Sequence, residues 1–233
     1  MTPAQPTQNY TIHLPEDYDA QISGILPYYS SFHQETINLV KSLPSRPKIW
    51  VDTGCGTGSL VSKAIEKFPD TKFFLVDPSE GMLDQARKKM SLYPAGRLEF
   101  LIASHTQEFS QKLEEKPDVI TAIQCHHYLS REGRAKASKV CYDLLSEGGV
   151  YITFENTRPL TDEGIAIGKR YWRNFQLSSG RSEEEVEKHL ERFDTEYFPI
   201  TIEEHLKLLR ETGFRTVELF WYSYMQAGFY CIK

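Results

Sequence analysis

Short apolar runs alternate along this chain with segments in which apolar residues recur every three or four positions. The runs at Ile49–Val51 and Lys72–Val76 have the length and composition of buried strands. A helical pattern follows each run: one begins at Ser59 and ends at Pro69, and the other spans Gly81–Tyr93. Because strands that alternate with helices form parallel sheets, the pattern predicts an α/β fold.

The same alternation continues through the rest of the chain. Further strands are predicted at Leu98–Ala103, Asp118–Ile123 and Val150–Phe154. Helices are predicted at Arg131–Leu145 and from Thr201 to Gly213. The chain is predicted to end in an antiparallel hairpin of Val217–Trp221 and Gly228–Ile232. A chain of 233 residues accommodates one such domain with an insertion.

Four segments can be separated by composition. Residues 1–47 form a leader that begins with a polar stretch and is then rich in tyrosine, residues 48–155 form the core, residues 156–198 form a charged helical insertion, and residues 199–233 form the closing helix and hairpin. The insertion includes a predicted helix at Arg181–Phe193, introduced by the capping box Ser182-x-x-Glu185. It follows the fifth strand, beside the edge where α/β sheets bind ligands, so we interpret it as a substrate lid. A solvated surface helix is the alternative for most of its charges.

A glycine-rich turn follows the first strand, in the pattern Asp52-x-Gly54-x-Gly56-x-Gly58. Glycines permit positive φ and the close approach of a ligand to bare backbone. The dinucleotide fingerprint G-x-G-x-x-G does not fit, because its third glycine would fall on Ser59 or on Val61. The turn therefore predicts a nucleotide-like ligand that is not a dinucleotide.

The second strand ends at Asp77, 19 residues after Gly58. An acid about 20 residues after the glycines, at the end of the second strand, accepts hydrogen bonds from a ribose diol. The alternative is that Asp77 caps the helix that follows.

These motifs resemble those of the class I S-adenosylmethionine-dependent methyltransferases, in which D-x-G-x-G is followed by a D-x-S-x-x-M-L segment, here Asp77 to Leu83. The resemblance implies a Rossmann-like sheet of seven strands with a C-terminal antiparallel hairpin and helices on both faces, and S-adenosyl-L-methionine as the cofactor. It implies that Asp52 orients the methionine part and that Met82 packs on the adenine. Many relatives have an aspartate where Ser104 stands, so recognition of the adenine by that side chain is not expected to follow the usual pattern.

A narrower resemblance is to the carboxy-S-adenosylmethionine synthases of tRNA wobble-uridine modification, from Pro27-x-Tyr29 through the run Arg181 to Gly213. Together the two resemblances imply a cofactor site of Tyr29, Asp52, Gly54, Cys55, Gly56, Gly58, Asp77, Pro78, Met82, Ser104, His105, Ile123 and Gln124. Those synthases hold the extra carboxylate with an arginine of the lid helix, and Leu190 stands at that position. Arg192 is expected to point to another face of the same helix. The sequence therefore predicts the ordinary cofactor rather than the carboxylated one.

The catalytic candidates lie at the ends of the fourth and fifth predicted strands. His127 titrates near neutral pH, and Glu155 carries a carboxylate at the strand exit, so either is suited to remove a proton from an acceptor. A structural role is the alternative for each. Because adjacent side chains point in different directions, at most one of His126 and His127 is expected to face a substrate. No metal-ligand spacing is present.

Composition limits the setting and the partners. The formal charge is −5, which argues against a surface that grips phosphate backbones, so a small-molecule acceptor is preferred over nucleic acid. The four cysteines lie far apart without a CxxC pair, and no apolar run is long enough for a membrane span, so a cytoplasmic monomer or homodimer is expected. Three readings stay open: a small-molecule methyltransferase, a tRNA-modification enzyme of the carboxy-S-adenosylmethionine synthase type, and a noncatalytic cofactor-binding subunit.

Overall fold

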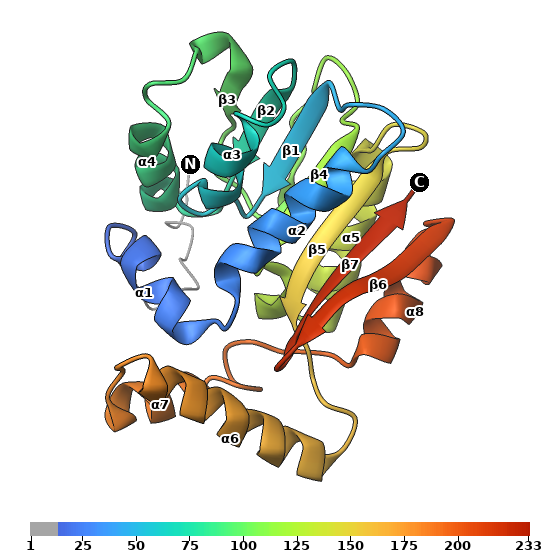
Figure 1. The fold of residues 1–233 in the computed structure, drawn as a ribbon. Coiled ribbons are helices and arrows are strands. Elements are labelled where there is room, and N and C mark those ends of the chain that lie inside the picture. The colour runs from blue at the N-terminus through green and yellow to red at the C-terminus, as the bar shows by residue number, and fades with distance from the viewer. Residues whose placement is uncertain (1–13) are drawn as a thin grey trace, which may run out of the picture.

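A single seven-stranded sheet forms the centre of the molecule. The computed structural model describes residues 14–233, so the polar stretch that opens the predicted leader lies outside it. The strands are β1 (Ile49–Thr53), β2 (Lys72–Val76), β3 (Leu98–Phe100), β4 (Val119–Ile123), β5 (Val150–Asn156), β6 (Thr216–Ser223) and β7 (Gln226–Ile232). Their order in the sheet is β3-β2-β1-β4-β5-β7-β6 (Figure 1).

The strands β3, β2, β1, β4 and β5 are parallel, and β7 pairs antiparallel with both β5 and β6. This confirms the predicted mostly parallel sheet with an antiparallel C-terminal hairpin. Strand β3 ends at Phe100, three residues earlier than predicted, because its ladder with β2 stops at the Leu75–Phe100 pair. The chain after it instead reaches β1, where Thr53 and Thr106 share a hydroxyl hydrogen bond of 2.8 Å.

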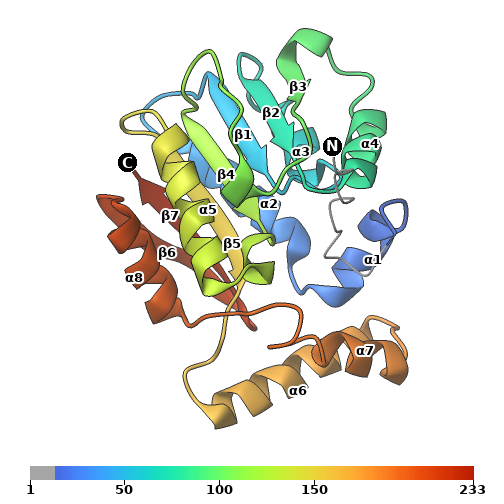
Figure 2. The ribbon, with the colours of Figure 1, turned by 180° about the vertical axis from the view of Figure 1, so that it is seen from behind.

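Helices cover both faces of the sheet. One face carries α2 (Tyr29–Lys41), α3 (Ser59–Ala64) and α4 (Glu80–Lys89), and the other carries α5 (Arg131–Leu144) and α8 (Ile202–Thr212), as Figures 1 and 2 show from opposite sides. Each layer buries its own apolar cluster against the sheet. Short 3₁₀ turns at Ala95–Arg97 (η1), Thr106–Glu108 (η2) and His126–Tyr128 (η3) complete the core.

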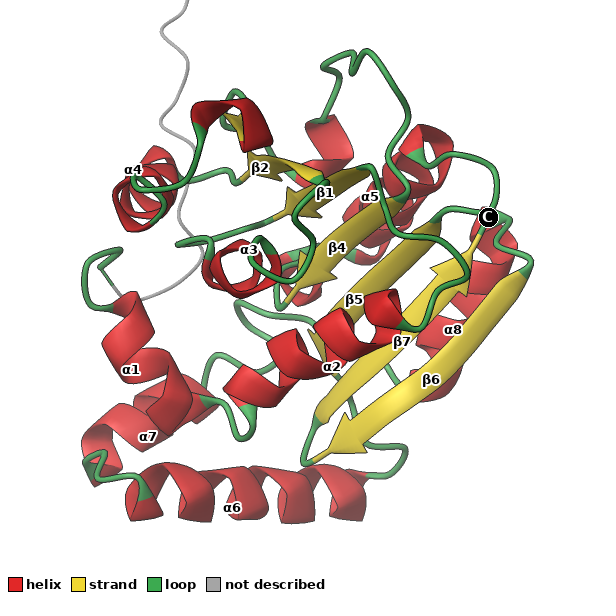
Figure 3. Ribbon diagram, turned by 45° about the horizontal axis from the view of Figure 1, so that its top comes forward, coloured by secondary structure: helices red, strands yellow, loops and turns green. Residues whose placement is uncertain are grey.

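Three further helices form a cap beyond the carboxyl ends of the parallel strands: α1 (Tyr18–Ile25), α6 (Asp162–Ser178) and α7 (Glu183–Leu190). Figure 3 shows them together along one side of the sheet. They share an apolar cluster that includes Ile22, Trp172 and Val186. The indole Nε1 of Trp172 also donates a 2.6 Å hydrogen bond to the carbonyl of Ile25, which joins the insertion to the leader.

Two details of the cap differ from the sequence prediction. Helix α1 was not predicted, because its apolar residues are few and pack in one cluster with residues of the distant α6 and α7. Helix α7 ends at Leu190 rather than Phe193, because the carbonyl of Arg192 accepts the amides of Thr195, Glu196 and Tyr197 in a tight turn. Because α7 ends at Leu190, Arg192 lies in the turn that follows the helix.

Candidate functional site

The glycine turn joins β1 to α3 at the edge of a cavity. Gly54 has φ 64°, and a Cβ placed on it would lie 2.6 Å from the Cβ of Cys125, so only glycine fits there. Gly56 has φ 54°, and a Cβ placed on it would meet nothing within 4 Å. The backbone of Gly56 therefore faces open space, as the turn of a ligand site requires.

Asp77 lies opposite this turn, at the end of β2. One carboxylate oxygen accepts the amide of Ser79 at 2.8 Å and the other accepts the amide of Gly56 at 2.9 Å. Burial raises the pKa of Asp77 to about 6, although these two backbone donors act to lower it. The N-cap of α4 is Ser79, whose hydroxyl accepts from the amide of Met82, so Asp77 is not the cap residue.

One cavity extends from the glycine turn and Asp77 to the cap. It is lined by Tyr18, Ile22, Ile25, Leu26, Gly54, Gly56, Asp77, Pro78, Met82, His105, Thr106, Gln107, Ile123, Gln124, Cys125, His126, His127, Tyr128, Leu129, Asn156, His189, Arg192 and Tyr197. Of the residues suggested for the cofactor, the structure brings together Gly54, Gly56, Asp77, Pro78, Met82, His105, Ile123 and Gln124. The glycine turn, β2 and the exit of β4 thus contribute to one wall.

Five of the suggested cofactor residues are not part of the cavity lining. Asp52 is buried, and one of its oxygens accepts a 2.6 Å hydrogen bond from the Thr121 hydroxyl. Burial raises the pKa of Asp52 to about 7. Tyr29, Cys55, Gly58 and Ser104 are also absent from the cavity lining. The tyrosine that α1 contributes to the lining is Tyr18, which packs edge-on against Tyr29 at 6.5 Å between ring centroids.

The far end of the cavity contains a buried pair, His127 and Glu155. His127 Nδ1 lies 3.0 Å from Glu155 Oε2, and the other oxygen of Glu155 accepts the Thr153 hydroxyl at 2.8 Å and the amide of His126 at 3.3 Å. Burial alone would raise the pKa of Glu155. The hydrogen bond from His127, and the positive charge that His127 carries when it is protonated at low pH, reverse this and bring the pKa of Glu155 to about 2.

Glu155 is therefore ionised, and its partner Nδ1 carries a proton. Burial lowers the pKa of His127, against the opposing effect of Glu155, so the imidazole is neutral at pH 7. Its Nε2 then bears a lone pair. Only His127 of this pair lines the cavity, and Glu155 lies behind it. The arrangement is that of a general base with an orienting carboxylate.

Both histidines of η3 line the cavity, whereas the expectation that at most one of them faces a substrate stays a prediction. The tight turn of η3 is the reason that both line it, since it does not place neighbouring side chains on opposite faces as an extended chain does. His126 Nδ1 pairs with the Tyr151 hydroxyl at 3.1 Å. Burial lowers the pKa of His126 to about 4, so His126 is a neutral group in the wall.

Arg192 lines the cavity, whereas Leu190 does not. The prediction assumed that Leu190 and Arg192 belong to one helix, but α7 ends at Leu190 and the turn after it redirects the chain. Leu190 packs in the apolar cluster of the cap. The guanidinium carbon of Arg192 lies 6.0 Å from the Tyr128 ring centroid and 5.8 Å from that of Tyr197.

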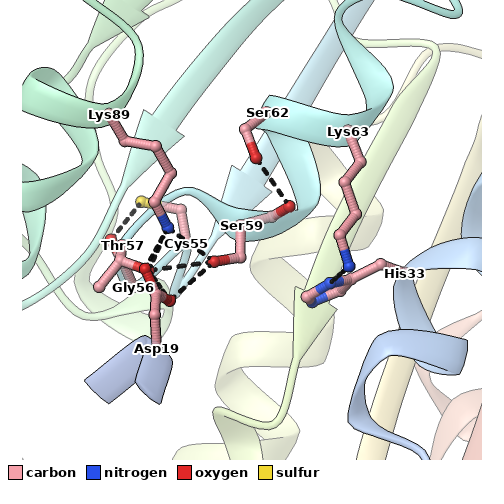
Figure 4. Close-up of polar contacts among 9 residues, drawn as sticks. All are labelled: Asp19, His33, Cys55, Gly56, Thr57, Ser59, Ser62, Lys63 and Lys89. Atoms are coloured by element: carbon pink, nitrogen blue, oxygen red, sulfur yellow. Dashed lines mark hydrogen bonds and ion pairs between the residues drawn. The ribbon is translucent and has the colours of Figure 1, made fainter. Parts of the chain in front are cut away.

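The cover formed by α1 is held to the glycine turn by a polar cluster, which we call the α1 latch: Asp19, Thr57, Ser59 and Lys89 (Figure 4). Asp19 accepts the hydroxyls of Thr57 at 2.7 Å and Ser59 at 2.9 Å. Lys89 of α4 forms an ion pair with Asp19 and donates to both hydroxyls. The latch fixes one end of α1 beside the glycine turn.

Sequence reasoning missed Tyr18, Asn156, Arg192 and Tyr197 as lining residues. Tyr18 lies in the tyrosine-rich part of the leader, for which no site residue other than Tyr29 was predicted. Asn156 follows Glu155 directly and belongs to the same strand exit. Arg192 and Tyr197 had no signal of their own, because a turn that no motif announces brings them to the cavity.

Among the described residues, no group of three or more His, Cys, Asp or Glu side chains is arranged to hold a metal ion. Within residues 14–233, no helix combines the length and the apolar character needed to cross a bilayer.

Comparison with known proteins places these features in context. Residues 51–151 match the model of a family described as a methyltransferase domain. The chain is 30% identical over 212 residues to a carboxy-S-adenosyl-L-methionine synthase of Wolinella succinogenes, covering 86% of this chain and 83% of that protein. It is 27% identical over 209 residues to the protein of the same name from Campylobacter lari, covering 86% of this chain and 84% of that protein. In structure it is similar to the magnesium protoporphyrin IX methyltransferase of Synechocystis with bound SAH. The TM-score is 0.63 and the identity 15%, and the match covers 91% of this chain and 86% of that chain.

Proposed function

Because the chain belongs to the S-adenosylmethionine-dependent methyltransferases, in the branch that includes the carboxy-S-adenosyl-L-methionine synthases, we propose that it methylates a small-molecule acceptor held beside His127. One observation carries the proposal: a single cavity is lined at one end by Gly56 and Asp77 and at the other by His127. A cofactor at the first end would present its reactive group toward the second.

The residues at the cofactor end fit S-adenosylmethionine. Each oxygen of Asp77 accepts one backbone amide and keeps a lone pair for one hydroxyl of a ribose diol. Gly56 leaves open space for the adjoining part of the cofactor, and Met82 offers an apolar surface to the adenine. The buried amide oxygen of Gln124 and that of Asn156 find no donor in the described part of the chain, so both can accept from the methionine ammonium.

The cofactor supplies an electrophilic methyl group on a sulfonium. The protein's task is then to align an acceptor with that group and to remove a proton where the acceptor carries one. His127 Nε2 accepts this proton, Glu155 stabilises the imidazolium that results, and the Thr153 hydroxyl holds Glu155 in place. The cap contributes apolar side chains such as Ile22 and Ile25 to the cavity, which would help to keep water from the reacting atoms.

Two measurements test this proposal. Calorimetry should show binding of S-adenosylhomocysteine and no binding of NAD, and a screen of metabolites should show methyl transfer from S-adenosylmethionine. Heat with NAD alone would contradict the cofactor assignment. Cofactor binding without transfer to any metabolite, together with a stable protein partner, would favour a noncatalytic subunit.

A carboxylated cofactor is the second candidate, because the relatives from W. succinogenes and C. lari are named carboxy-S-adenosyl-L-methionine synthases and because Arg192 lines the cavity. Leu190 stands where those synthases are expected to have the arginine that holds the extra carboxylate, and leucine has no hydrogen-bond donor for that group. Mass spectrometry of the ligand that co-purifies separates the two candidates, since the carboxylated cofactor is heavier than S-adenosylmethionine.

A further inference from the structure

The turn after α7 presents two polar side chains to the acceptor end of the cavity. The carbonyl of Arg192 accepts the amide of Tyr197 at 3.2 Å, so the backbone holds the two residues close together. The amide of Phe198 donates a 2.7 Å hydrogen bond to the carbonyl of His127. The turn is therefore fixed relative to the proposed base.

Arg192 places a positive charge in the cavity wall. Its side chain is 7% exposed, and its Nε donates to Glu196 Oε2 at 2.6 Å, with Glu196 largely in solvent. A guanidinium is always charged and its planar fork matches a carboxylate. This positive charge favours an anion at this end of the cavity, and the same charge acts to lower the pKa of His127.

Tyr197 supplies a hydroxyl that the protein itself does not use. The residue is 1% exposed, and its hydroxyl is buried without a hydrogen-bond partner among residues 14–233. Burial raises the pKa of Tyr197, so the phenol stays protonated and can donate. Leaving a buried hydroxyl unpaired is unfavourable, and a ligand that accepts its hydrogen bond would remove that cost.

Apolar side chains line the same cavity as this pair. They are Ile22 and Ile25 of α1, Leu26 directly after that helix, and Leu129 after η3. An acceptor that consisted only of charged groups would leave these surfaces unmatched. The site is suited to a molecule with an apolar body and one anionic end.

We infer that the acceptor is a small carboxylic acid with an apolar body, and that Arg192 and Tyr197 together bind its carboxylate. This inference rests on the proposed function, because it concerns the molecule that His127 would deprotonate. The ring centroids of His127 and Tyr197 lie 6.0 Å apart, so the carboxylate and the reacting atom belong to one compact molecule.

The test compares small carboxylic acids with their neutral amides, which have nearly the same shape. Probes such as 4-hydroxybenzoate, 4-hydroxyphenylacetate and their amides are titrated by calorimetry into the full chain saturated with S-adenosylhomocysteine. We expect at least one acid to bind and its amide to bind roughly ten- to a hundredfold more weakly, which is the effect of losing a charge-assisted hydrogen bond.

Tyr197→Phe is the sharpest variant, because it removes a hydroxyl without a partner and so should not lower the melting temperature. It should weaken binding of the acid roughly tenfold or more and leave binding of the amide and of S-adenosylhomocysteine unchanged. Arg192→Gln should abolish the preference for acid over amide. Tyr222→Phe, at an exposed position on β6, is the matched control and should change nothing.

The remaining outcomes overturn the inference. Acids and amides that bind equally well, or no acid that binds to a protein saturated with S-adenosylhomocysteine, would exclude a carboxylate subsite for the acceptor. Weaker binding of S-adenosylhomocysteine in Tyr197→Phe would assign the subsite to the cofactor's own carboxylate, and a carboxylated cofactor found in the purified protein would assign it to the added group. Failure of S-adenosylhomocysteine to bind the unmodified chain would instead contradict the proposed function.

Discussion

The two ends of the cavity are built in different ways. At the cofactor end, backbone groups of the glycine turn and one carboxylate, Asp77, come from strands that are neighbours in the sheet. At the acceptor end, side chains come from η3, β5 and the turn after α7, up to 71 residues apart in the sequence between His126 and Tyr197. The residues at the cofactor end are therefore brought together by the pairing of the parallel strands, whereas those at the acceptor end are brought together by the packing of the cap on the sheet.

The largest expected effect breaks the acceptor end alone. His127→Asn should lower kcat about 10²- to 10⁴-fold, because it removes the proposed base, and should leave the Kd of S-adenosylhomocysteine unchanged. Glu155→Gln should lower kcat less, since it removes only the charge that stabilises the imidazolium. The assay is methyl transfer to the acceptor found in the screen, with calorimetry on the same preparations. Unchanged kcat in a folded His127→Asn variant would show that the pair is structural.

The next effect breaks the cofactor end. Asp77→Ala should weaken the binding of S-adenosylhomocysteine by about 1.5–3 kcal/mol, because two ribose hydroxyls lose a charged acceptor. Calorimetry measures the change, and Ser79→Ala is the control, because it removes the N-cap of α4 and leaves the carboxylate in place. Equal losses in both variants would mean that the effect comes from the local fold and not from Asp77.

A pH titration sharpens the comparison without a mutation. The pKa of Asp77 is raised to about 6 by burial, so the carboxylate is ionised above that pH and protonated below it. Only the ionised form offers both acceptors to the ribose, so the affinity for S-adenosylhomocysteine should fall about tenfold between pH 7 and pH 5. Asp77→Asn should flatten the profile. A profile that keeps its slope in Asp77→Asn would point to another group, such as Asp52, whose pKa burial raises to about 7.

The smallest effect concerns the α1 latch, which closes the cofactor end from outside. The side chains of Asp19 and Lys89 are 44% and 28% exposed, and partly exposed ion pairs contribute about 1 kcal/mol or less. Asp19→Asn should therefore raise the dissociation rate of S-adenosylhomocysteine only about two- to fivefold, measured by stopped flow. Asp17→Asn removes the same charge two residues earlier, outside the latch, and should leave the rate unchanged. If the unmodified chain, Asp19→Asn and Asp17→Asn all release S-adenosylhomocysteine at the same rate, α1 does not limit its release.

The cofactor end could be read from the sequence because its signals are local. Three glycines at alternate positions, an acid at the end of each of two strands, and helical periodicity after both are visible within the 45 residues from Ile49 to Tyr93. The seven-stranded, mostly parallel sheet with its C-terminal antiparallel hairpin followed from the resemblance that these signals carry. Even here the sequence did not separate residues in the wall from those behind it: Asp52 ends a strand as Asp77 does, yet its carboxylate accepts from Thr121 on the neighbouring strand.

The acceptor end was decided by tertiary structure. His127 and Glu155 were recognisable as candidates from their places at strand exits, but their 3.0 Å pairing depends on β4 and β5 lying side by side. Helix α1 has too few apolar residues to be predicted alone, and it is stabilised by α6 and α7 from the other end of the chain. Arg192 reaches the cavity because α7 stops at Leu190, where a turn closed by the carbonyl of Arg192 competes successfully with another turn of helix. Periodicity specifies the face of a helix only as far as the helix continues, so the packing of the cap determined what surrounds the acceptor.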